Sequence, residues 1–120
     1  MTAAFECEAR VRVPDIDAFH RRVTELGGTL RQEYAFSDHY YRPAGMPWDR
    51  ERQSLRIRTH ARPESSPDAD SEVLFTSVDV MSVEGLPFKR SRFREGKRRL
   101  FSGSFAECRE VVEGLAFHPW

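Results

Sequence analysis

The stretch that decides the fold is FECEARVRV, residues 5–13. Apolar and charged residues alternate along it, and successive side chains of a β-strand point to opposite faces. Two carboxylates and two guanidinium groups in one row can hold a divalent metal and the anion that travels with it; the alternative interpretation is a solvated outer face. The apolar face carries Phe5, Cys7, Ala9, Val11 and Val13, and the charged face carries Glu6, Glu8, Arg10 and Arg12.

The length and composition limit the classes of protein to which the chain can belong. A chain of 120 residues is long enough for one domain with one modest core. Its 19 basic and 19 acidic residues give a formal net charge of zero, so the basic field of a nucleic-acid-binding protein is absent. Charged residues make up 32% of the chain, so either the surface is unusually charged or charged side chains line a cavity.

The termini and cysteines predict a cytoplasmic protein without membrane contact. The first residues, MTAAFECEA, lack the basic and apolar regions of a signal peptide. No apolar stretch approaches the roughly 20 residues that span a membrane. Cys7 and Cys108 have no metal-type spacing, and we predict that both are small buried residues in a reducing compartment.

Two amphipathic helices are predicted. Asp15 can cap the first helix, and Gly27 ends it. Ser104 and Glu107 form a capping box for the second helix. The apolar stripes have the same offsets from their caps, so the two segments look like one unit used twice. These stripes are Ile16, Phe19, Val23 and Leu26, and Phe105, Cys108, Val112 and Leu115.

The remaining residues predict strands joined by turns. Glu84 and Gly85 suit a hairpin turn, and the last three predicted strands read as a meander. The predicted order is strand, helix, five strands and helix, which is an α+β fold with an antiparallel sheet. The five strands are expected over residues 29–36 (extending to 41), 53–59, 72–83, 86–93 and 97–102, with loops over 43–48 and 62–71.

Five short motifs, in order and at similar spacing, resemble those of the CYTH domain family. This family of triphosphate tunnel proteins includes class IV adenylate cyclases and thiamine triphosphatases. The family patterns are E-x-E-x-K, a helix ending near L-G, D-x-Y-[FY], L-R-[IV]-R and E-x-L-G-F. They are matched by ECEAR at 6–10, ELGG at 25–28, DHYY at 38–41, LRIR at 55–58 and, loosely, EGLAF at 113–117.

The resemblance implies one CYTH-like domain over residues 1–120, in which the antiparallel sheet forms an open or partial tunnel with both helices packed outside. In this family, glutamates hold Mg²⁺ or Mn²⁺ and basic side chains bind a triphosphate. The implied metal ligands are Glu6 and Glu8. The implied triphosphate-binding residues are Arg10, Arg12, Arg56, Arg58, Lys89, Arg90 and Arg92.

The chain also departs from the family pattern. Arg10 replaces the lysine of the first motif, Ser77 replaces the lysine of L-T-[FY]-K, and the acidic strand before the second helix is basic here, at residues 97–99. The resemblance leads us to expect that the chain corresponds to the N-terminal half of a full tunnel. Three functions remain open: metal-dependent triphosphate hydrolysis or nucleotide cyclisation, non-catalytic binding of an anion or nucleotide, and a half-tunnel that assembles as a homodimer.

Overall fold

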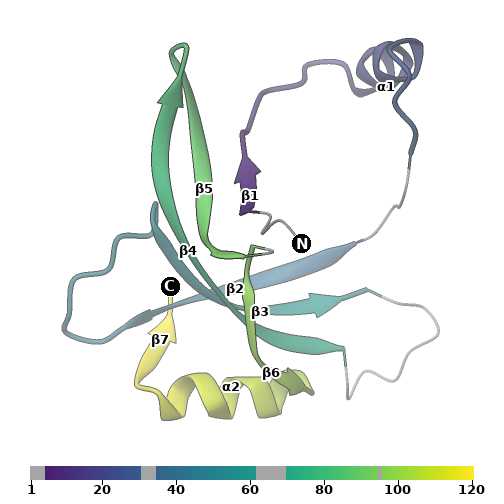
Figure 1. The fold of residues 1–120 in the computed structure, drawn as a ribbon. Helices are drawn as coiled ribbons and strands as arrows, with labels where there is room; N and C mark the ends of the chain where they lie inside the picture. The colour runs from purple at the N-terminus through teal and green to yellow at the C-terminus, as the bar shows by residue number, and fades with distance from the viewer. Residues whose placement is uncertain (1–4, 31–34, 62–69, 95) are drawn as a thin grey trace.

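The computed structural model describes residues 5–30, 35–61, 70–94 and 96–120. They form an α+β fold with two helices and a seven-stranded antiparallel open sheet (Figure 1), as predicted at this level. The elements are β1 (Phe5–Glu8), α1 (Ile16–Glu25), β2 (Phe36–Pro43), β3 (Gln53–His60), β4 (Ser71–Val83), β5 (Leu86–Arg94), β6 (Arg98–Gly103), α2 (Phe105–Gly114) and β7 (Phe117–Pro119).

The long strand β4 organises the sheet. The strand order is β1-β5-β4-β3-β2-β7. Strand β6 lies off this path and pairs with β4. The first part of β4 pairs with β3 and β6, and its second part pairs with β5. The predicted meander is therefore wrong at its last step, because β6 pairs with β4 instead of β5. The chain bends between β5 and β6, where the Ser91 hydroxyl donates to the Gly96 carbonyl at 2.8 Å.

The two helices begin and end as predicted. The Asp15 carboxylate accepts a hydrogen bond from the Ala18 amide at 3.0 Å, and Gly27 has φ +89° after the last turn of α1. Ser104 and Glu107 form the capping box of α2, with bonds of 3.1 and 3.2 Å. The hairpin turn is also confirmed, with φ values of +50° at Glu84 and +81° at Gly85.

The core lies between α2 and one face of the sheet. The helix packs against β3, β4, β6 and β7. Alternation on β3 and β4 directs one row of apolar side chains toward the helix. The buried cluster consists of Tyr41, Leu55, Ile57, Val73, Cys108 and Val112.

Several predictions are wrong for features that depend on tertiary packing. Helix α1 has no buried residue and stands away from the sheet, so only α2 packs outside it (Figure 1). Cys7 is exposed, whereas Cys108 is buried as predicted. Strand β1 ends at Glu8, and β7 was not predicted.

Two predicted segments lie partly outside the described residues. Of the predicted strand over 29–36, residues 31–34 are not described; the prediction is wrong for residues 29, 30 and 35, which are not in a strand, because β2 begins at Phe36 and runs to Pro43. The predicted connection over 62–71 is described only from residue 70. Neither described helix is long and apolar enough to cross a membrane.

Candidate functional site: a charged cavity

An open cavity of about 790 Å³ lies on the face of the sheet opposite α2. Seven cationic side chains and four carboxylates of the described chain line it, an excess of three positive charges. They come from β1, β2, β3 and β5, from the segment that follows β1, from the loop before β3 and from the turn before β6. The cations are Arg10, Arg50, Arg52, Arg56, Arg58, Lys89 and Lys97, and the carboxylates belong to Glu6, Glu8, Asp38 and Glu51.

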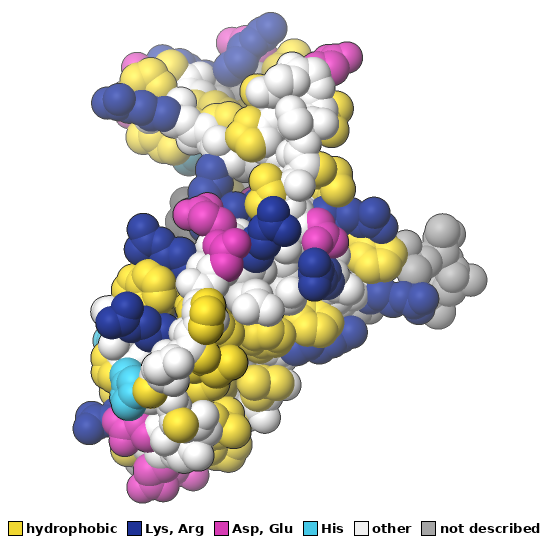
Figure 2. Space-filling view, turned by 90° about the vertical axis from the view of Figure 1, so that its left-hand side faces the viewer, with side chains coloured by type: hydrophobic (Ala, Val, Ile, Leu, Met, Phe, Trp, Pro, Cys, Tyr) yellow, Lys and Arg dark blue, Asp and Glu magenta, His cyan; other side chains and the backbone are white. Residues whose placement is uncertain are grey.

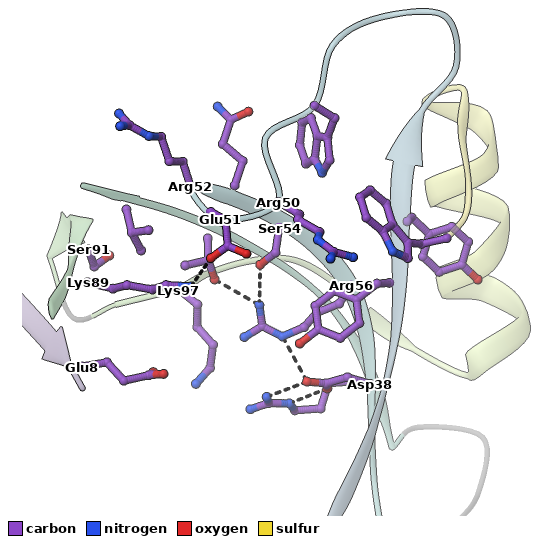
Figure 3. A pocket seen from close by; sticks show the side chains of 18 of the residues that line it. Glu8, Asp38, Arg50, Glu51, Arg52, Ser54, Arg56, Lys89, Ser91 and Lys97 are labelled. Atoms are coloured by element: carbon purple, nitrogen blue, oxygen red, sulfur yellow. Dashed lines mark hydrogen bonds and ion pairs between the residues drawn. The ribbon is translucent and has the colours of Figure 1, made fainter. Parts of the chain in front are cut away.

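Arg56 is the most buried cation of the cavity, with 9% of its surface exposed. Alternation on β3 places it on the face opposite Leu55 and Ile57. Its Nη1 donates to Ser54 Oγ at 3.0 Å and to Thr76 Oγ1 at 3.1 Å. The buried Nε has no hydrogen bond within the described chain, although it lies 3.4 Å from Asp38 Oδ2. This leaves Nη2 as the donor that faces the cavity (Figure 3).

Asp38 is shared between two guanidinium groups. It lies opposite Arg58 in the β2–β3 register and binds that side chain in a bidentate pair at 2.8 and 2.9 Å. This hydrogen bonding raises the pKa of Arg58, whereas burial lowers the pKa of Arg56 and repulsion by Arg58 lowers it further. The three side chains are only 11–14% exposed, so one carboxylate faces two cations in a site that is largely shielded from water.

The opposite wall of the cavity comes from β1 and β5. Glu8 is paired with Arg10 at 3.0 Å, and Lys89 reaches Glu51 of the loop at 3.5 Å. Figure 3 shows Glu8 and Lys89 pointing toward the space in front of Arg56. The Glu6 carboxylate lies against the backbone of Gly96, where an added Cβ would come within 2.5 Å of Glu6 Oε2. Gly96 therefore makes room for an acidic side chain at the wall.

Aromatic side chains border the end of the cavity near the C-terminus. The Trp120 ring lies 5.3 Å from the Arg42 guanidinium and 5.2 Å from that of Arg50, which are cation–π distances. Its amide donates to the Tyr40 carbonyl at 3.0 Å. Tyr41 also reaches this end of the cavity but belongs to the buried core cluster beside α2, and burial raises the pKa of its hydroxyl.

The structure brings six of the nine predicted site residues to the cavity and leaves three elsewhere. Arg90 and Arg92 lie on the face of β5 opposite Lys89: Arg90 stacks on Phe5 at 4.6 Å, and Arg92 pairs with Asp79 at 2.8 Å. Arg12 lies beyond the end of β1, where strand alternation no longer directs it. The six that line the cavity are Glu6, Glu8, Arg10, Arg56, Arg58 and Lys89.

Sequence reasoning missed about half of the charged lining. Arg50 and its two neighbours sit in a loop, where no periodicity predicts a direction. Asp38 was noticed only as part of a motif, and its role depends on the β2–β3 register. Ser54 alternates with Arg56 and could have been assigned to the same face. The missed charged residues are Asp38, Arg50, Glu51, Arg52 and Lys97.

The carboxylates fit a metal that arrives with an anion better than a metal held by protein alone. Among the described residues, no group of three or more His, Cys, Asp or Glu side chains could hold a metal ion. Mg²⁺ is commonly bound by one or two carboxylates together with substrate phosphates and water. Glu6 and Glu8 supply two such carboxylates at one wall.

Comparison of the chain with protein-family models, with curated protein sequences and with solved structures finds no match in any of the three. The class of protein is therefore defined by the fold and the site alone. It is an α+β protein whose open antiparallel sheet carries a helix on one face and a charged cavity on the other.

Proposed function

We propose that the cavity binds a small molecule carrying a triphosphate or polyphosphate, together with Mg²⁺ or Mn²⁺, in the manner of the CYTH family. In this proposal the open sheet is one part of a triphosphate tunnel. The observation that carries the proposal is Arg56, which is buried, held by Ser54 and Thr76 through Nη1, and open to the cavity through Nη2 (Figure 3).

Electrostatics supports an anionic ligand. Removing a guanidinium group from water is costly unless an anion compensates it. Asp38 compensates only one of its two neighbouring arginines, and the whole lining has an excess of three positive charges. A chain of phosphates offers charge and acceptor oxygens along its length, and guanidinium groups bind phosphate with strong charge-assisted hydrogen bonds.

Glu6 and Glu8 would hold the metal at the wall facing Arg56. When bound, the metal neutralises phosphate oxygens and supports phosphoryl transfer. The cations of β3 and β5 would position the phosphate chain. The reaction that this arrangement supports is triphosphate hydrolysis or nucleotide cyclisation.

A second candidate is a binding module without catalysis. It is favoured by the pairing of the Glu8 carboxylate with Arg10 at 3.0 Å, which occupies one of the two proposed metal ligands. In that case the cavity holds the same anion, and the metal is not needed for binding.

Thermal denaturation with tripolyphosphate, with and without Mn²⁺, tests the proposal. Ligand at about 100 times its dissociation constant stabilises the folded state by roughly 2.7 kcal/mol, so the melting temperature is expected to rise. Arg56→Met should abolish the rise. Arg109→Met should retain it, because Arg109 is exposed on α2 and pairs with Glu113.

Sulfate at matched ionic strength serves as the control for salt screening. Phosphate release with Mn²⁺, lost in the Glu6→Gln/Glu8→Gln double variant, identifies an enzyme. A shift that needs no metal and releases no phosphate identifies the binding module. No shift, or an equal shift in Arg56→Met, contradicts both candidates.

A further inference from the structure

A second open cavity, of about 550 Å³, adjoins the charged cavity and differs from it in chemistry. The two cavities share Trp48 and Trp120 in their walls. No carboxylate of the described chain lines the second cavity, and its charged or titratable side chains are those of Arg42 and His118. The rest of its wall is largely apolar and comes from residues 43–47, in the loop that joins β2 to β3.

Charged and apolar surfaces also meet on the outside of the molecule at this side. Figure 2 faces the side on which the loop between β2 and β3 projects in Figure 1. Charged side chains form a band across the middle of this view, and hydrophobic side chains are exposed below it. A ligand with one charged part and one apolar part therefore matches this side of the molecule better than a ligand that is charged throughout.

The two tryptophans differ in how firmly they are held. Trp48 packs against the core and meets the ring of Phe117 edge-on, with the ring centroids 5.5 Å apart. Trp120 remains 50% exposed. Its ring lies 5.2 Å from the guanidinium of Arg50, which lines the charged cavity, and 5.3 Å from that of Arg42, which lines the second cavity. Trp120 thus offers an open aromatic surface at the boundary of the two cavities, beside a cation of each.

Strand register connects Trp120 to the buried Arg56. The Trp120 amide donates to the Tyr40 carbonyl at 3.0 Å, and Tyr40 is directly opposite Arg56 in the β2–β3 register. Directly opposed residues of neighbouring strands share one face of a sheet, so these three side chains form a row on the cavity face. Neighbouring strands are about 4.8 Å apart, so the row covers about 10 Å. A nucleotide can span this distance with its base at one end and its phosphate chain at the other.

We propose that the second cavity binds the planar aromatic ring of an organic triphosphate, such as the base of a nucleoside triphosphate, with Trp120 as the stacking surface. This inference rests on the proposed function, because it places the phosphate chain in the charged cavity at Arg56. Aromatic rings stack favourably on an indole, and every base has a face that can do so. Arg42 and His118 are the polar groups that meet the heteroatoms of the ring. Inorganic tripolyphosphate leaves this cavity empty, so the protein selects an organic triphosphate over it.

Binding of ATP and of inorganic tripolyphosphate, each with Mg²⁺, tests the subsite, because only ATP carries a ring. Trp48 and Trp120 are the only tryptophans of the chain, so the Trp48→Phe variant retains Trp120 as its sole tryptophan fluorophore. Saturating ATP should quench the fluorescence of this variant much more than saturating tripolyphosphate does, because the stacked base contacts the indole.

Isothermal titration calorimetry measures the contribution of the ring to affinity. ATP should bind roughly tenfold more tightly than tripolyphosphate, as expected for one stacked base. Trp120→Leu should weaken ATP binding roughly tenfold more than tripolyphosphate binding, and Trp120→Phe should restore much of the difference because it keeps a ring. Phe19→Leu removes an exposed ring of α1 outside both cavities and is the control, with an unchanged ratio of the two affinities. Circular dichroism checks that each variant folds.

The outcomes separate this inference from the proposed function. The ring subsite is contradicted, and the proposed function stands, if tripolyphosphate binds but ATP binds no more tightly. Equal weakening of both ligands by Trp120→Leu, or Trp120 fluorescence that ATP leaves unchanged, has the same meaning. If neither ligand binds, the proposed function fails and the subsite fails with it.

Discussion

The molecule has a packed half and an open half. The packed half comprises α2, β2, β3, β6, β7 and the first part of β4, and the open half comprises β1, α1 and the β4–β5 hairpin. Every buried hydrophobic residue of the described chain belongs to the packed half: Tyr41, Leu55, Ile57, Val73, Leu74, Cys108 and Val112. The open half instead carries many of the large exposed hydrophobic side chains.

The two helices illustrate the difference between the packed half and the open half. Both have ten residues, a side-chain N-cap and a leucine C-cap with nearly identical backbone angles. Yet α2 buries Cys108 and Val112, and α1 buries nothing. Local sequence is therefore enough to form an amphipathic helix, but it does not decide what the helix packs against.

The cavity joins the two halves. The packed half supplies Arg56 and Asp38 on rigid central strands, and the open half supplies Glu6, Glu8 and Lys89 from its edge. In the proposed function, the packed half therefore holds the phosphate and the open half brings the metal ligands.

The largest expected effect comes from placing a charge in each helix stripe. Val112 is fully buried, so Val112→Asp should lower the free energy of unfolding by about 3 kcal/mol or more, which is enough to unfold a marginally stable domain. Val23→Asp should change it by less than about 0.5 kcal/mol. Urea denaturation followed by circular dichroism measures both, and equal losses would show that α1 packs as α2 does.

The second effect concerns the shared carboxylate. Asp38→Asn leaves two nearly buried guanidinium groups without a counter-charge, so we expect a loss of about 3 kcal/mol in stability. Stabilisation by tripolyphosphate should become larger, because the anion then replaces the lost charge. Glu113→Gln removes an exposed carboxylate paired with Arg109 and is the control, with little effect on either measurement. A variant that is as stable as the parent would show that Asp38 does not hold the cations.

The third effect uses the two cysteines, one in each half. A thiol reagent should label Cys7 in the folded protein and Cys108 only after unfolding, because Cys7 is exposed and Cys108 is buried. Rapid labelling of both thiols in the native state would contradict the packing of α2.

The buried Cys108 thiol makes the free energy of unfolding depend on pH in the alkaline range. Burial raises the pKa of Cys108 above its ordinary value of 9.0, with a smaller contribution from Glu107. The folded state therefore holds the thiol proton more tightly than the unfolded state. The stabilisation that Cys108 gives the folded state is complete below pH 9. As the pH rises through the raised pKa this stabilisation is lost, and the free energy of unfolding falls by up to about 1.4 kcal/mol per pH unit. Unfolding curves of the parent and of Cys108→Ala between pH 7 and 10 should diverge above pH 9 only.

The smallest effect compares two residues with positive φ. Glu84 at the hairpin tip has φ +50°, and Ala116 after α2 has φ +63°. Glycine adopts these angles without strain, so Glu84→Gly and Ala116→Gly should each add about 0.5 kcal/mol. Ala106→Gly inside α2 is the control and should cost up to about 1 kcal/mol. If only Ala116→Gly raises the unfolding midpoint, the hairpin unfolds separately from the packed half.

The extent of sequence-based prediction differed between local and distant features. The caps at Asp15 and Ser104, the turn at Glu84 and the alternation of Arg56 with Ile57 could be predicted, because each depends on residues close in sequence. The shared face of Glu6 and Glu8 followed from the same alternation, whereas Lys89 was assigned to the site only through the resemblance. Arg90 and Arg92 were assigned to the site through the resemblance and their place in a basic strand, although alternation separates them from Lys89.

The sequence by itself determined where helices and turns lie and which side chains share a face of a strand, because these follow from caps, glycines and a period of two. Only the tertiary structure decided that β6 joins β4, that Asp38 lies between Arg56 and Arg58, that Arg50 and Lys97 reach the same cavity and that α1 remains uncovered. Those features depend on strand register and on the proximity of residues distant in the chain, which no local pattern records.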